Sequence, residues 1–149
     1  MRNVKIAVVA AFLAFGALLM GCSGGDPVIV CGREWNPGSQ IVADTGSAFG
    51  MKDQLIVQFR YGTGFDFNSL KVTFYEGTLE SKGTEIWSHE ARVSDKMNSY
   101  TLQGRTRHSN YMTAREMTRH KEPGPIVIEV STEGRVLASK QITLVKKVD

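Results

Sequence analysis

The chain has 149 residues and a formal net charge of +3. All fifteen acidic residues follow position 22, and residues 22–149 contain sixteen lysines and arginines, so this part carries a net charge of only +1. That balance gives no argument for nucleic-acid binding. The two cysteines and three histidines show no spacing suited to zinc, and no cofactor is expected.

The N-terminal segment has the pattern of a signal peptide. Arg2 and Lys5 supply positive charge, and residues 6–20 contain no charged side chain. This apolar run fits a signal-peptide core of roughly 7–15 residues and is shorter than the about 18 needed to span a bilayer. We therefore expect residues 1–21 to be removed as a signal peptide.

The apolar run ends in Leu19-Met20-Gly21-Cys22, which resembles the lipobox of bacterial lipoproteins. The resemblance covers only the first twenty-two residues. It implies cleavage after Gly21, a diacylglyceryl group on the Cys22 thiol and acylation of the new amine. Two or three acyl chains hold a protein firmly on a membrane, since each buried methylene contributes about 0.8 kcal/mol. The alternative is an ordinary signal peptide followed by an unrelated cysteine.

The residue after the lipobox cysteine is Ser23. In enterobacteria an aspartate there resembles an inner-membrane retention signal, so the serine favours the outer membrane, on its periplasmic face or at the surface. Residues 22–27 then form the lipidated cysteine and a short tether, and residues 28–149 form one domain. Cys31 is left without a partner, and we expect it to be buried at the end of a strand, the alternatives being an intermolecular disulfide and a reactive site.

Alternating apolar and polar residues predict most of the strands. Residues 28–50 are expected to hold one loose strand and long turns, with Trp35 and Phe49 buried. Further strands are predicted at residues 55–61, 70–75, 84–92, 99–103, 126–130 and 136–145.

The last two predicted strands form the hairpin that the sequence indicates most clearly. We expect Gly134 to adopt a left-handed conformation and to close a loop of three to five residues. Val136, Ala138 and Ile142 are predicted to continue the inward-facing pattern, which Lys140 interrupts.

A short helix is predicted near residues 113–120. Thr113 followed by Glu116 is a capping-box pattern, and Pro123 prevents the helix from continuing. A strand is the alternative, because apolar and polar residues also alternate from residue 112 to residue 116.

Six or seven short strands with one short helix indicate a mainly β fold, an antiparallel β-sandwich. The serial layout resembles the immunoglobulin-like modules of bacterial surface proteins, although the Cys…Trp…Cys pattern of true immunoglobulin domains is absent. A small β-barrel is the alternative fold.

Cationic residues cluster between positions 105 and 121, where Glu116 is the one acidic residue. The candidate surface for an anionic partner consists of Arg105, Arg107, Arg115, Arg119 and Lys121. Arg115 and Arg119 are four residues apart and would be neighbours on a helix. The alternative is a solvated crossover between two sheets.

We find no motif for nucleophilic catalysis and no local metal-ligand pair, so an enzyme is not expected. The hypothesis is a lipid-anchored, non-enzymatic binding or accessory module of the bacterial cell envelope. Its expected partners are the membrane, through the anchor, and an envelope protein, an anionic glycan or a lipid. The alternative is a small envelope enzyme or ligand carrier with a polar site at one end of the sandwich.

Overall fold

The computed structural model describes residues 26–105, 107–108 and 111–147. The predicted signal peptide and Cys22 lie outside these residues. No helix in the described ranges is long and apolar enough to cross a membrane.

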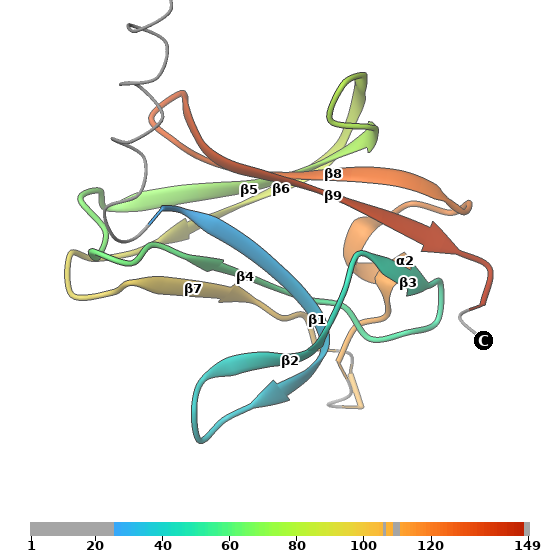
Figure 1. The fold of residues 1–149 in the computed structure, drawn as a ribbon, viewed down its shortest axis with the longest axis horizontal. Helices are drawn as coiled ribbons and strands as arrows, with labels where there is room; N and C mark the ends of the chain where they lie inside the picture. Colours follow the sequence, from blue (N-terminus) through green and yellow to red (C-terminus); the bar gives the residue numbers. More distant parts are fainter. Residues whose placement is uncertain (1–25, 106, 109–110, 148–149) are drawn as a thin grey trace, which may run out of the picture.

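Within the described residues, nine strands form two sheets that pack face to face (Figure 1). The four-stranded sheet has the order β2-β1-β4-β7 and comprises β1 (Val28–Asn36), β2 (Ile41–Thr45), β4 (Ile56–Arg60) and β7 (Ser99–Leu102). The five-stranded sheet has the order β3-β9-β8-β5-β6 and comprises β3 (Ala48–Gly50), β5 (Ser69–Gly77), β6 (Lys82–Arg92), β8 (Gly124–Thr132) and β9 (Arg135–Val145).

The strand order is that of an immunoglobulin-like β-sandwich. In the lettering used for immunoglobulin domains, β1, β4 and β7 correspond to strands A, B and E, and β9, β8, β5 and β6 correspond to G, F, C and C′. The two sheets are not closed into a barrel, so the predicted sandwich is confirmed and the barrel alternative is wrong. One pairing departs from the antiparallel prediction, because β3 runs parallel to β9.

The prediction for residues 28–50 is wrong in its detail, since this segment contains three strands. β1 and β2 form a hairpin whose turn is closed by Asn36, which accepts hydrogen bonds from the amides of Gly38 and Ser39 through its side-chain oxygen. β3 then crosses to the other sheet. Phe49 is buried as predicted, whereas Trp35 is only half-buried.

The β8–β9 hairpin is confirmed, with a shorter loop than predicted. Thr132 pairs with Arg135, so only Glu133 and Gly134 form the loop. Their φ angles are 50° and 77°, and two successive left-handed residues are typical of the two-residue turns that match the twist of a hairpin.

Val136 faces solvent and is 53% exposed, contrary to the prediction. The cause is a register shift between Val130 and Ser131. Because of the shift, buried Val130 pairs with Ala138, while Val136 pairs with Ser131 and shares its outward direction. One added residue in a strand reverses which side chains face the core.

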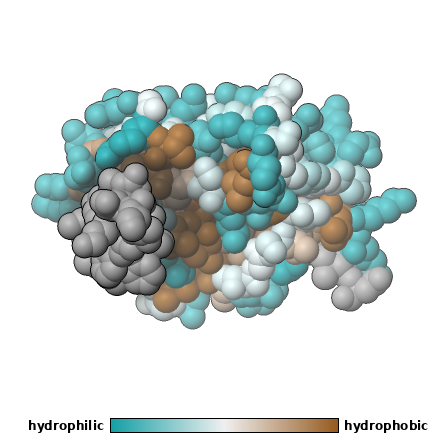
Figure 2. Space-filling model, turned by 45° about the horizontal axis from the view of Figure 1, so that its top comes forward, coloured by the Kyte–Doolittle hydropathy of each residue, from teal (hydrophilic) through white to brown (hydrophobic). Residues whose placement is uncertain are grey.

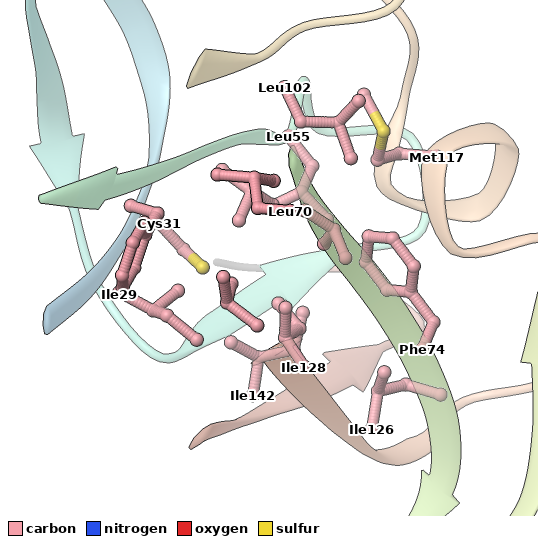
Figure 3. Packing of buried hydrophobic residues seen from close by; sticks show 14 of the residues in the cluster. Ile29, Cys31, Leu55, Leu70, Phe74, Leu102, Met117, Ile126, Ile128 and Ile142 are labelled. Atoms are coloured by element: carbon pink, nitrogen blue, oxygen red, sulfur yellow. The ribbon is translucent and has the colours of Figure 1, made fainter. Parts of the chain in front are cut away.

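The core lies between the sheets and is closed at one end by the helix. Figure 3 shows Met117 of the helix pointing into the same interior as Leu55 and Leu102. The largest fully buried side chains include Phe49, Phe59, Phe74, Leu55, Leu70, Ile126, Ile128 and Ile142. The two sheets therefore share one continuous apolar core.

Cys31 is buried in this core, at 1% exposure, and it lies inside β1 and not at its end. Burial raises the pKa of its thiol to about 12, and the positive charge of Lys140 lowers the pKa only in part. The raised pKa favours the folded state below pH 9, and this contribution declines as the pH rises from 9 towards 12, because the unfolded chain ionises first.

We expect Cys31 to resist thiol reagents in the folded protein. At pH 8 its thiolate fraction is about 1,000-fold lower than in an unfolded chain, from a pKa difference of about three units, and the reagent also lacks access. Labelling with a chromogenic disulfide in a Cys22→Ser variant would measure this, with and without denaturant. Equal rates in the two conditions would contradict the buried position.

Candidate binding site at the helix end of the sandwich

The predicted helix is present as α2 (Ala114–Thr118), and the strand alternative is wrong. The hydroxyl of Thr113 accepts a hydrogen bond from the Glu116 amide, and the Glu116 carboxylate accepts one from the Thr113 amide at 2.8 Å. These bonds from Thr113, the backbone one first, lower the pKa of the Glu116 carboxyl. The Glu116 carboxylate is therefore held at the helix cap in its ionised form.

Two backbone hydrogen bonds fasten α2 to the loop that follows β3. The amide of Ala114 donates to the carbonyl of Asp53 at 2.6 Å, and the amide of Arg115 donates to the carbonyl of Met51 at 3.1 Å. The intervening residue, Lys52, is therefore held beside the helix. The sequence carried no signal for this contact, because Lys52 lies more than sixty positions before α2.

A pocket of about 530 Å³ opens at this place, and we call it the basic pocket. It is lined by Met51, Lys52, Thr113, Arg115, Glu116, Arg119, His120 and Lys121. Among the described residues, Lys52, Arg115, Arg119 and Lys121 have no carboxylate within ion-pair distance. Four unpaired cations around one pocket give it a positive potential.

The acidic groups nearest to the pocket are engaged elsewhere. The Asp53 carboxylate accepts hydrogen bonds from Arg33 Nε at 3.0 Å and from the Gly50 amide at 2.8 Å. The Glu116 carboxylate is held by the cap. The charge of Asp53 is therefore balanced by Arg33, whereas Glu116 keeps its negative charge and is the one acidic side chain among the residues that line the pocket, against four cations.

Of the five predicted cations, the structure brings Arg115, Arg119 and Lys121 together around the pocket. Arg105 and Arg107 do not line it. The guanidinium of Arg105 lies 4.5 Å from the centre of the Tyr111 ring and donates to its hydroxyl at 3.1 Å. Arg107 is exposed in a turn.

Arg119 does not share a helix face with Arg115, so that prediction is wrong. The helix ends at Thr118, and Arg119 is its C-cap with a left-handed φ of 55°. This conformation places its guanidinium 4.4 Å from the centre of the Trp87 ring.

Trp87 fixes the position of both α2 and Arg119. Its ring stacks on buried Phe74 with a centroid separation of 5.2 Å, and its indole N–H donates to the Met117 carbonyl at 2.9 Å. An orphan carbonyl of the helix C-terminus is satisfied in this way. Since a cation over an indole is attracted to the ring, the guanidinium is held at the rim of the pocket.

A second hollow, the β6–β7 groove, lies beside α2 and has a volume of about 330 Å³. It is lined by Trp87, His89, Tyr100, Thr101, Leu102, Gln103, Gly104, Met112, Glu116, Met117 and Arg119. Arg119 and Glu116 line both the groove and the basic pocket. The two hollows therefore form one continuous surface around the helix.

A polar contact across the groove joins the two sheets. His89 Nε2 and the Tyr100 hydroxyl lie 3.1 Å apart, and burial raises the pKa of Tyr100, which keeps its hydroxyl protonated. Gln103 Oε1 is buried without a hydrogen-bond partner in the described part of the chain. An unsatisfied buried acceptor is costly, and a donor from a bound molecule would relieve that cost.

The three histidines do not converge. His89 bonds Tyr100, His120 Nε2 lies 3.2 Å from the Glu76 carboxylate, and His108 is exposed. The described residues contain no group of three histidine, cysteine or acidic side chains that could hold a metal ion.

No protein-family model matches the chain, and no curated protein matches its sequence. Among solved structures, it is similar to an immunoglobulin-like protein from Pseudomonas aeruginosa, with 15% sequence identity and a TM-score of 0.48. That similarity covers 80% of this chain and 94% of the other.

Proposed function

We propose that this protein is a lipid-anchored, non-enzymatic binding module of the bacterial cell envelope, and that it holds an anionic partner at the α2 end of its sandwich. The observation that supports the proposal is the basic pocket, in which four cations without ion-pair partners among the described residues meet around one hollow. Like charges placed so close repel one another, and an anionic partner would offset that repulsion.

The position of the pocket favours a partner in the aqueous compartment over the anchoring membrane. β1 begins at the end of the sandwich opposite to α2 (Figure 1). β9 runs from the first end to the second, where the Val145 carbonyl accepts from the Met51 amide next to α2. Eleven strand residues span about 35 Å, so the pocket lies roughly that far from where the tether enters.

The tether itself keeps the β1 end near the membrane. Six residues from Cys22 to Pro27 reach at most about 20 Å when fully extended. Val28 and Val136 are both exposed, and both begin strands that start at this end. Figure 2 shows that hydrophobic residues on one face of the molecule gather in a hollow between hydrophilic rims. In the proposed arrangement, the β1 end is thus directed towards the lipid and the basic pocket away from it.

For the anchor, we expect that a Cys22→Ala variant is not lipidated and leaves the membrane fraction. The physical reason is that no acyl chain is then available for insertion into the bilayer. Metabolic labelling with a radioactive fatty acid and fractionation of the envelope would measure both effects. Retention of the variant in the membrane fraction, with normal cleavage after Gly21, would show that the lipobox interpretation is wrong.

For the partner, we expect the lipidated protein to retain a molecule during affinity capture from envelope membranes at 0.15 M salt and to release it as salt rises to 1 M. The reason is that the Debye length falls from about 8 Å to about 3 Å over that range. Capture followed by stepwise salt elution measures the effect. A partner that remains bound at 1 M salt would show that binding does not depend on the exposed cations.

A further inference from the structure

We propose that the β6–β7 groove accepts an extended acidic segment of a partner protein, which pairs with the free edge of β7 as an added strand. This inference rests on the proposed binding function and names its partner class. Three observations carry it: an open and unprotected sheet edge, an unsatisfied acceptor and adjacent positive charge.

An open sheet edge follows from the topology. In constant-type immunoglobulin domains, strand D pairs with strand E, which corresponds to β7. Here β6 and β7 are joined by residues 93–98 alone, and no strand is formed between them. Within the described residues, β7 pairs only with β4 and β6 pairs only with β5. Two free edges therefore face the same side of the sandwich.

The β7 edge lacks the features that usually prevent strand pairing. Exposed edges are commonly protected by charged residues, prolines or bulges. β7 reads Ser99-Tyr100-Thr101-Leu102, without a charge or a proline, and its register with β4 is regular. β6 differs, since it carries Lys82, Glu85, Glu90 and Arg92 and contains a register shift opposite Phe74 and Tyr75. Of these two edges, β7 is the one suited to receive a strand.

The groove beside this edge supplies polar and charged contacts. Gln103, directly after β7, holds the buried acceptor that has no partner among the residues the structure describes, and a backbone or side-chain N–H of an added segment would satisfy it. At the α2 end of the groove, the Arg119 guanidinium is held over Trp87 and has no carboxylate partner among the described residues. A guanidinium presents parallel N–H donors that match a carboxylate.

The charge of the surroundings selects an acidic segment. Arg119 lines both the groove and the basic pocket. In that pocket Arg115, Lys52 and Lys121 also have no ion-pair partner in the described part of the chain. Main-chain hydrogen bonds to β7 would supply general affinity, and acidic side chains beside these cations would supply selectivity, as in other complexes formed by strand addition. A second copy of this chain fits less well, since it would bring a similar set of cations to the pocket.

The test places a photoreactive phenylalanine analogue at Tyr100, an aromatic residue that lines the groove, in the full-length lipidated protein in its own envelope. We expect irradiation to yield an adduct with a segment of another protein that is rich in aspartate and glutamate, as identified by mass spectrometry. We expect an Arg119→Glu change to reduce the adduct at least tenfold. The same analogue at Leu79, which is 54% exposed on the connection between β5 and β6, is the control and should not yield the adduct.

Hydrogen exchange of the purified complex separates strand addition from side-chain docking. Amides of residues 99–102 that do not pair with β4 should exchange at least tenfold more slowly in the complex, whereas β6 amides should be unchanged. An adduct with a second copy of this chain, with a glycan or with a non-acidic segment would overturn the proposal, as would the absence of an adduct or of protection. If the salt-sensitive capture persists in that case, the inference has failed while the proposed function stands.

Discussion

Replacing Phe59 by alanine is expected to lower the free energy of unfolding by about 3–5 kcal/mol. Phe59 is 1% exposed and contacts two other aromatic rings, with centroid separations of 5.9 Å to Phe65 and 6.3 Å to Tyr61. Removal of the ring leaves a cavity that its close-packed neighbours can fill only in part. Urea denaturation of the chain without its lipid, followed by circular dichroism, would measure the loss.

Leu79→Ala is the matched control for this prediction, because Leu79 is 54% exposed. A surface truncation of this kind usually changes stability by less than about 0.5 kcal/mol. A loss below about 1 kcal/mol for Phe59→Ala would contradict the inward direction of this β4 side chain.

Replacing Trp87 by alanine is expected to cost about 3 kcal/mol, near the lower end of the range for large aromatic residues, since Trp87 is only half-buried. The change removes the stack on Phe74, the hydrogen bond to the Met117 carbonyl and the support for Arg119. Thermal and urea unfolding would measure the loss of stability.

A Trp87→Phe variant separates these contributions. A phenylalanine can keep the stack but cannot donate to Met117, so about 1 kcal/mol should be lost. An equal loss for the alanine and phenylalanine variants would mean that the hydrogen bond alone holds α2. No loss for either variant would contradict the structural role of Trp87.

Local signals in the sequence predicted the elements that depend on local contacts. The capping box joins Thr113 to a residue only three positions away, so its pattern is visible without any tertiary structure. The β8–β9 hairpin joins adjacent strands and is marked by Gly134. The direction of Val136 was mispredicted because the register shift at Ser131 depends on cross-strand pairing.

Only one of the three strands between residues 28 and 50 was predicted, because these strands are short and are interrupted by unusual backbone conformations. Gln40 and Asp44 adopt positive φ angles without being glycine, so the usual glycine signal for such positions is absent. β3 has only three residues and is stabilised by its partner β9, almost a hundred positions later. No periodicity within such a segment can indicate that pairing.

The candidate site also depends on long-range contacts, which the sequence does not indicate. The cluster of cations after residue 105 was visible in composition, and three of its five predicted members line the basic pocket. Lys52 and Trp87 lie at the site only because a loop and a strand that are distant in the sequence pack against α2. α2 ends before Arg119, whose guanidinium lies over the ring of Trp87 on a distant strand, and no local pattern indicates that contact.

The most direct test of the account compares affinity capture by the wild-type lipidated protein with capture by an Arg115→Glu/Lys121→Glu variant. Both residues are exposed, so the melting temperature should change little. A Lys96→Glu/Lys146→Glu variant is the control, because it alters the net charge equally at exposed sites outside the basic pocket. The account predicts at least a tenfold loss of the captured partner for the first variant and normal capture for the control. Normal capture by the first variant, or equal losses by both, would contradict binding at the basic pocket.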